Sequence, residues 1–195
     1  MPSPTRIGEA GLPPSPAGAA GAPPGTGGLA ALARMVKLSH SLFALPFAAS
    51  AVVLVAPSAS LEPWRLLLVA IAVVAARTAA IAMNRVADRW YDAQNPRTAR
   101  RELVTGEVSP RAAWALLAGS AGTFVVASAL ISELCGWLAL PVLGILLGYS
   151  YAKRFTWTCH LWLGVAQALA PIGVAIALTG TAPAASVVLG LGVGA

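Results

Sequence analysis

The chain is poor in charged residues, and this shortage excludes an ordinary water-soluble domain. Only 10 % of its 195 residues are Asp, Glu, Lys or Arg, whereas soluble domains carry about 25 %. Hydrophobic residues make up 57 %, and the mean hydropathy is +0.75. The formal net charge of +6 does not indicate nucleic-acid binding, because the basic residues stand at the ends of apolar segments. The composition predicts an integral membrane protein.

Cysteine and histidine are also scarce. The two cysteines, Cys135 and Cys159, have no metal-ligand spacing, and the two histidines, His40 and His160, have no carboxylate or second His at ligand spacing. A disulfide framework and a zinc site are therefore excluded. The remaining chemistry must come from carboxylates, amides and basic side chains.

The first 29 residues contain no bulky apolar cluster but are rich in Pro and Gly, including Pro13-Pro14 and Pro23-Pro24. They predict a disordered tail over residues 1–29. Arg6 is followed by Ile, Gly and Glu, with prolines soon after, and not by the continuous apolar core of a signal peptide. We expect the first membrane helix itself to be the insertion signal.

Residues 30–195 predict an all-α transmembrane bundle forming one domain, with about five complete spans and part of a sixth. The expected spans cover about residues 30–56, 66–94, 110–131, 137–151 and 158–178, and the incomplete one follows a turn at 179–183. Pro46 is expected to kink the first span, and 132–136 to form a tight turn. Arg77 lies inside the second span, where it could snorkel, pair with a carboxylate or face an aqueous cavity.

The basic residues predict the orientation of the bundle. One side of the expected membrane carries Arg34, Lys37, Arg85, Arg89, Arg97, Arg100, Arg101, Arg111, Lys153 and Arg154, while the opposite connections carry Arg65. By the positive-inside rule, the N-terminus and the loops after the second and fourth spans are cytoplasmic. We therefore expect a multi-pass protein of the cell inner (plasma) membrane.

The most informative stretch lies at the cytoplasmic end of the second span. Asn84, Asp88 and Asp92 recur at i, i+4 and i+8, so on a helix they form one polar face over roughly 12 Å. Pro96 should end this helix at Asn95, which places Asp92 near the negative end of the helix dipole. A divalent cation would offset both the unfavourable interaction of Asp92 with the helix dipole and the repulsion between the carboxylates.

Basic residues follow this acidic face at once. Arg97 and Arg101 have the planar guanidinium that matches phosphate oxygens, so the stretch predicts a Mg²⁺-diphosphate site at the membrane surface. A second interpretation stays open, in which Arg85 pairs with Asp88 and Arg89 with Asp92 as simple i, i+3 ion pairs.

These residues resemble the first aspartate-rich motif of the UbiA superfamily of intramembrane prenyltransferases, Asn-x-x-x-Asp-x-x-x-Asp followed by Arg-Thr and a further basic residue. The positions are filled by Asn84, Asp88, Asp92, Arg97, Thr98 and Arg101. Tyr149 to Arg154 resembles the family's Tyr-x-x-x-Lys-Arg stretch, although an aromatic belt with snorkelling cations would give the same pattern. The run from Lys37 to Phe47 is most similar to the 4-hydroxybenzoate polyprenyltransferase-like branch, which includes bacterial menaquinone-pathway members.

The resemblance implies Mg²⁺-dependent transfer of a polyprenyl group from its diphosphate to an aromatic acid carrying hydroxyl and carboxyl groups, as in ubiquinone and menaquinone biosynthesis. It implies metal ligation by Asn84, Asp88 and Asp92, with Asp88, Asp92 and Lys153 as catalytic residues. The implied diphosphate-binding residues are Lys37, Arg97, Arg101, Tyr149 and Lys153. Lys37 stands where relatives usually carry Arg, and the change removes bidentate geometry while keeping the charge.

One feature of the family has no counterpart in this sequence. UbiA-type enzymes have nine helices and a second aspartate-rich motif between the sixth and seventh, whereas this chain has no carboxylate after Glu133. We therefore expect the 195-residue chain to be a fragment or truncated product without activity alone. Two other functions are weighed: a CDP-alcohol phosphotransferase, whose Asp-Gly-x-x-Ala-Arg run is not found, and a non-enzymatic membrane carrier or scaffold.

Overall fold

The structure is a computed structural model. It describes residues 28–36, 44–59, 61–155 and 159–194. For residues 44, 45, 58 and 153–155 it describes the backbone and not the side chains. These ranges contain helices and no strand, which confirms the predicted all-α class. Four helices are long and apolar enough to cross a membrane: Pro63–Gln94, Pro110–Ile131, Glu133–Ala152 and Cys159–Thr179.

Helix α4, Pro63–Gln94, is the longest element and carries the polar face. Its 32 residues begin with Pro at the first turn and end before Asn95, whose extended backbone precedes Pro96, as predicted. At 1.5 Å per residue the helix is about 48 Å long, against about 30 Å of hydrocarbon in a bilayer. The last turns of α4 therefore project beyond the apolar layer.

Helix α6, Pro110–Ile131, returns along α4, and the two pack through small side chains. Ala79 and Ala82 of α4 and Ala113 of α6 are fully buried where the two backbones approach closely. The side chain of Ser109 caps α6 by accepting a hydrogen bond from the amide of Ala112 at 3.2 Å. The third predicted span is confirmed with these boundaries.

Helix α7, Glu133–Phe155, begins earlier than predicted. The expected turn at 132–136 is wrong, because Ser132 accepts a hydrogen bond from the amide of Cys135 at 3.2 Å and starts the helix directly. Gly136 makes this possible, since its missing side chain leaves room for Ala129 of α6. Pro141 lies inside α7.

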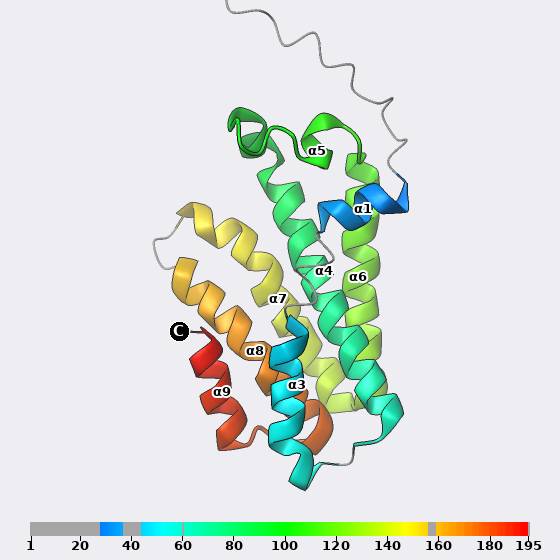
Figure 1. Ribbon diagram of the computed structural model, residues 1–195, viewed down its shortest axis with the longest axis vertical. Coiled ribbons are helices and arrows are strands. Elements are labelled where there is room, and N and C mark those ends of the chain that lie inside the picture. The colour runs from blue at the N-terminus through cyan, green and yellow to red at the C-terminus, as the bar shows by residue number, and fades with distance from the viewer. Residues whose placement is uncertain (1–27, 37–43, 60, 156–158, 195) are drawn as a thin grey trace, which may run out of the picture.

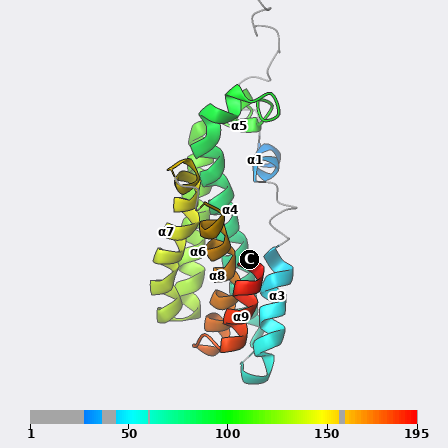
Figure 2. The ribbon, with the colours of Figure 1, turned by 90° about the vertical axis from the view of Figure 1, so that its left-hand side faces the viewer.

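Three further helices complete the bundle. Helix α8, Cys159–Thr179, runs back along α7, and α9, Ala184–Gly194, packs against α8. Helix α3, Ala44–Val55, lies against α8 and continues into a 3₁₀ turn, Ala56–Ser58. Figures 1 and 2 show the helices side by side as one elongated bundle. With 12 and 11 residues, α3 and α9 are shorter than a membrane span.

The expectation of a single helix over residues 30–56 is wrong. Helix α1, Leu29–Met35, ends at Met35, and α3 is a separate element. Figure 1 shows α1 lying across the upright helices beneath α5, Glu102–Thr105. The reason is packing: Ala31, Met35 and Val36 are buried in a cluster with side chains of α4, α5 and α6. The predicted tail lies outside the described residues except for Gly28 and Leu29.

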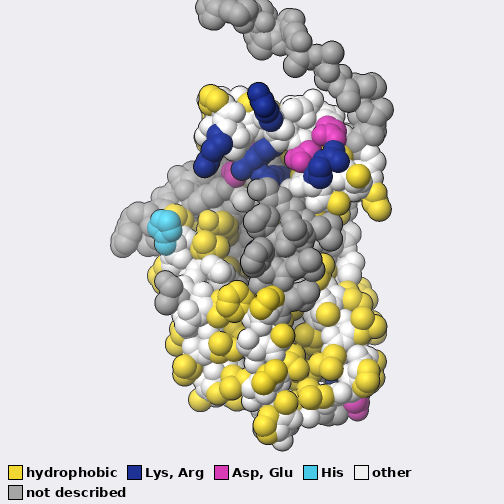
Figure 3. Space-filling model, in the orientation of Figure 1, with side chains coloured by type: hydrophobic (Ala, Val, Ile, Leu, Met, Phe, Trp, Pro, Cys, Tyr) yellow, Lys and Arg dark blue, Asp and Glu magenta, His cyan; other side chains and the backbone are white. Residues whose placement is uncertain are grey.

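Charged side chains gather at one end of the molecule, where α4 ends and α5 begins, above a mostly apolar face (Figure 3). This separation agrees with the charge distribution expected from the sequence.

Candidate functional site

The acidic face of α4 ends under a loop that folds back over the helix. The loop is built by a turn at Asn95, whose side chain accepts a hydrogen bond from the amide of Arg97 at 3.0 Å. Thr98 is 7 % exposed, and its hydroxyl donates to the carbonyl of Asp92 at 3.0 Å. Thr98 therefore fastens the loop to the last turn of α4.

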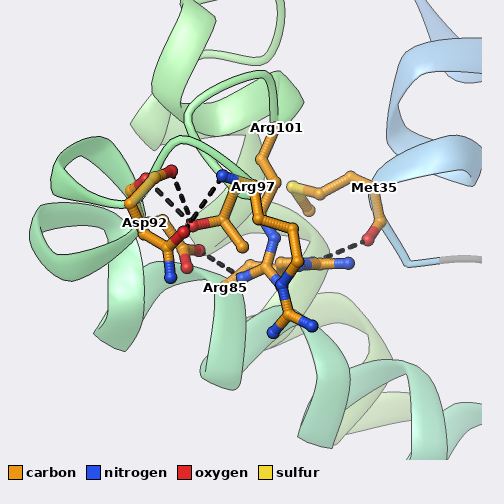
Figure 4. Close-up of polar contacts among 7 residues, drawn as sticks. Met35, Arg85, Asp92, Arg97 and Arg101 are labelled. Carbon is orange, nitrogen blue, oxygen red and sulfur yellow. Dashed lines mark hydrogen bonds and ion pairs between the residues drawn. The ribbon is translucent and has the colours of Figure 1, made fainter.

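Asp92 is buried and paired with this loop. Its residue is 8 % exposed, and its Oδ2 lies 2.5 Å from Nη1 of Arg101 (Figure 4). The alternative pairing with Arg89 is not found, because Arg89 is exposed and Asp92 is held by Arg101 instead. The loop thus brings one predicted phosphate-binding guanidinium onto one predicted metal-binding carboxylate.

Arg85 was predicted only as a neutralising charge, but it connects α4 to α1. Its Nε donates to the carbonyl of Met35 at 3.1 Å, at the end of α1 (Figure 4). A second contact fixes α1 at the same end of the bundle, an ion pair between Arg34 and Glu107. Neither contact could be predicted from local sequence patterns, since each joins residues 50 or more positions apart.

An apolar cavity of about 570 Å³ is lined mainly by side chains of α4, α7 and α8. Asn84 of α4 and Tyr149 of α7 both line it. Asp88 is one helical turn beyond Asn84 and acts electrostatically on Tyr149. The first member of the acidic face therefore belongs to the cavity wall, and the second lies directly beyond it.

Arg77 also lines the cavity, so of the three possibilities open from the sequence the structure supports a side chain that faces a cavity. Its Nε is buried and has no hydrogen-bond partner among the described residues. Arg77 precedes Asn84 by two turns on the same face of α4, about 10 Å along the helix axis. Gln167 of α8 is a further polar lining residue, and sequence analysis missed it, although it is an isolated amide in an apolar span.

The donor set fits a divalent cation that is shared with a phosphate. Within the described part of the chain no group of three His, Cys, Asp or Glu side chains could hold a metal by itself. Two carboxylates and one amide supply only part of the octahedral shell of Mg²⁺, which usually keeps waters and substrate phosphate oxygens as its other ligands. In the structure, the buried carboxylate of Asp92 is paired with the guanidinium of Arg101.

The other predicted site residues are placed in part. Arg97 lies in the loop and is exposed. Lys37 falls outside the described residues, and Lys153 is placed on α7 by its backbone alone, so neither side chain is located.

Comparison with known proteins gives consistent matches. Residues 43–195 match the UbiA prenyltransferase family. Two 4-hydroxybenzoate octaprenyltransferases are similar to the chain. That of Aromatoleum aromaticum is 37 % identical over 116 residues, which cover 59 % of this chain and 39 % of that protein. That of Xanthomonas campestris pv. campestris (strain B100) is 38 % identical over 126 residues, which cover 62 % of this chain and 40 % of that protein. The chain thus spans about two fifths of the length of these curated relatives.

Solved structures share the fold. The apo structure of a UbiA homolog from Aeropyrum pernix K1 has a TM-score of 0.69 and 36 % identity, covering 78 % of this chain and 56 % of that one. A UbiA homolog from Archaeoglobus fulgidus bound to GPP and Mg²⁺ has a TM-score of 0.59 and 23 % identity, covering 84 % and 54 %.

Proposed function

Because the chain belongs to the UbiA prenyltransferase family, we propose that it serves the transfer of a polyprenyl group from polyprenyl diphosphate to a hydroxylated aromatic carboxylic acid. The acceptor class is 4-hydroxybenzoate-like or naphthoate-like, as in ubiquinone or menaquinone biosynthesis. The names of the similar octaprenyltransferases support this proposal. Family membership also favours it over a CDP-alcohol phosphotransferase or a non-enzymatic scaffold.

One observation carries the proposal: the charged end of α4 and the apolar cavity meet at Asn84 and Tyr149. A prenyl diphosphate has the same two parts, an anionic head joined to an apolar tail. The cavity is lined mainly by apolar side chains of α4, α7 and α8, so it suits the tail, and the head then lies beside Asp88 and the loop.

In this proposal Asn84, Asp88 and Asp92 hold Mg²⁺, and Arg97 and Arg101 of the loop bind the diphosphate. Lys37 and Lys153 complete the basic set. Bound Mg²⁺ neutralises charge on the departing diphosphate. The guanidinium groups act in the same direction, because they bind the diphosphate more strongly as its negative charge grows. The binding of GPP and Mg²⁺ by the Archaeoglobus fulgidus homolog is consistent with this assignment.

The allylic part of the substrate then faces Tyr149. Its aromatic ring can stabilise developing positive charge, and the apolar walls exclude water that would capture it. Asp88 acts electrostatically on this same ring, so the acidic and aromatic groups belong to one site.

In this proposal Arg77 binds the carboxylate of the aromatic acceptor. It is a cation in an otherwise apolar cavity, and its buried Nε lacks a hydrogen-bond partner in the described part of the chain. A buried donor of this kind is costly unless a ligand satisfies it. Arg77 and Asn84 are separated by about 10 Å along the helix axis, so the proposed acceptor site lies two turns from the metal-binding face.

The proposed setting is the inner (plasma) membrane, with the N-terminus, the loop after α4 and the end of α7 on the cytoplasmic side. The four long apolar helices and the charges gathered at one end support it. The lipid bilayer, a polyprenyl diphosphate and an aromatic acceptor are the proposed partners.

Binding of a labelled prenyl diphosphate tests the proposal. The purified chain in nanodiscs should retain labelled GPP in the presence of Mg²⁺ and release it when EDTA is added. Asp88→Asn should reduce retention at least roughly 10-fold, because it removes a charged ligand. Glu133→Gln, at the opposite end of α7, is the control and should bind like the unmodified chain. Retention that is equal with EDTA and in Asp88→Asn would refute the metal-diphosphate site.

A further inference from the structure

We propose that the Arg101 guanidinium binds the carboxylate of Asp92 when no divalent cation is present. When the cation and the substrate bind, the guanidinium leaves Asp92 and binds diphosphate oxygens instead. This inference rests on the proposed function and adds an exchange of partners to it. It starts from the contact of 2.5 Å between Arg101 and Asp92. Each of these two side chains is assigned a different ligand in the reaction, yet here they bind each other.

The loop allows this exchange without moving its backbone. Thr98 fastens the loop to α4 through the carbonyl of Asp92, and this hydrogen bond does not involve the Arg101 side chain. The backbone of Arg101 is fixed separately, since its amide donates to the carbonyl of Thr98 at 3.0 Å. Its carbonyl accepts from the amides of Val104 and Thr105 at 2.8 and 2.9 Å, at the start of α5. Only the guanidinium needs to move.

Burial explains why Asp92 requires such a partner. Its side chain is 11 % exposed, and an unpaired carboxylate there would have a large desolvation cost. The Arg101 side chain is 32 % exposed, so its other nitrogen atoms can reach water and an incoming anion. The pair therefore satisfies the Asp92 carboxylate before a cation binds, and Arg101 is the more exposed of its two members.

The electrostatic surroundings favour release once an anion is present. Arg85 acts electrostatically on Arg101 and also on Asp92, Glu102 and Asp88, so the pair lies in a cluster of charges of both signs. A divalent cation at Asp92 adds further repulsion to Arg101, whereas a diphosphate attracts it. Cation and diphosphate should therefore bind cooperatively, because the cation replaces Arg101 as the partner of Asp92 and the diphosphate replaces Asp92 as the partner of Arg101.

The test is a Mn²⁺ titration of the purified chain, read by electron paramagnetic resonance. With Mn²⁺ alone, Arg101→Ala should bind the ion roughly 5- to 30-fold more tightly than the unmodified chain, because Asp92 is released from its competitor. The matched control is Arg100→Ala. Arg100 is the adjacent residue, is exposed, and makes no hydrogen bond or ion pair with the described residues, so its loss should change Mn²⁺ affinity less than roughly 3-fold.

Two further measurements separate exchange from a general change of charge. In the Asp92→Asn background, removal of Arg101 should no longer tighten Mn²⁺ binding, because there is no carboxylate to release. With inorganic pyrophosphate present, the sign should reverse, and Arg101→Ala should bind Mn²⁺ more weakly than the unmodified chain. Arg101→Gln provides a second variant if Arg101→Ala does not fold.

The outcomes are distinguishable from those for the proposed function. Mn²⁺ affinity that is unchanged or lowered in Arg101→Ala and Arg101→Gln without pyrophosphate would overturn the exchange and leave the metal site standing. Equal tightening in Arg100→Ala would also overturn it. If neither the unmodified chain nor any variant binds Mn²⁺, the exchange and the proposed metal site both fail.

Discussion

The contact between Arg85 and Met35 predicts that α1 is held in place by the helix that carries the acidic face. Arg85→Gln removes a charge-assisted hydrogen bond of 3.1 Å from a half-buried guanidinium to the end of α1. Hydrogen bonds of charged groups contribute about 1.5–3 kcal/mol when buried, so about 1–2 kcal/mol is a fair value here. Such a loss raises the population in which α1 is undocked roughly 5- to 30-fold.

Hydrogen–deuterium exchange measures this population directly. The amides of Ala31, Leu32 and Val36 are hydrogen-bonded within or next to α1, so they become exchangeable only when this segment opens. In Arg85→Gln, their exchange should accelerate roughly 5- to 30-fold, while the amides in the middle of α6 keep their protection.

Arg89→Gln is the control, because Arg89 is exposed one turn further along α4. Its α1 amides should exchange at the rate of the unmodified chain. Equal rates in Arg85→Gln and Arg89→Gln would refute the argument that Arg85 fixes α1. The apolar side chains of Met35 and Val36, which are 0 % and 2 % exposed, would then be sufficient to dock this helix.

Two further predictions concern the packing of α9 and the cavity. Gly190→Ala should destabilise the α8–α9 packing by about 1–3 kcal/mol, because the new Cβ would lie 2.8 Å from the carbonyl oxygen of Ala168. SDS unfolding followed by tryptophan fluorescence measures this loss. Gly192→Ala is the control, since it has open space on the same helix and should be nearly neutral; equal effects of the two substitutions would contradict the prediction. Arg77→Met should weaken binding of 4-hydroxybenzoate roughly 10-fold or more in equilibrium dialysis without reducing thermal stability, and unchanged binding would remove Arg77 from the acceptor site.

Local signals in the sequence predicted much of the fold. Pro96 ends α4, and Ser109 with Pro110 starts α6, and each acts through its own backbone geometry or side chain. The separate helix α1 could not be predicted in this way. Its position depends on Arg85 and on buried contacts with α5 and α6, all of which are distant in sequence.

The same distinction applies to the candidate site. The spacing of Asn84, Asp88 and Asp92 predicted one face of one helix, and the structure places Asn84 on the cavity wall with Asp88 beyond it. Spacing alone could not tell which arginine pairs with Asp92. That choice is made by the turn at Asn95, which directs the loop back so that Arg101, and not Arg89, reaches the carboxylate.

The central claim is that the acidic face of α4 binds a divalent ion together with a diphosphate. A structure of the chain with Mn²⁺ and GPP, using the anomalous signal of manganese, tests it most directly. We expect a single strong peak about 2.0–2.3 Å from a carboxylate oxygen of Asp88, with the diphosphate between this ion and Arg101 and the tail in the cavity beside Tyr149. A diphosphate bound elsewhere, or no manganese peak near Asp88 and Asp92, would contradict it.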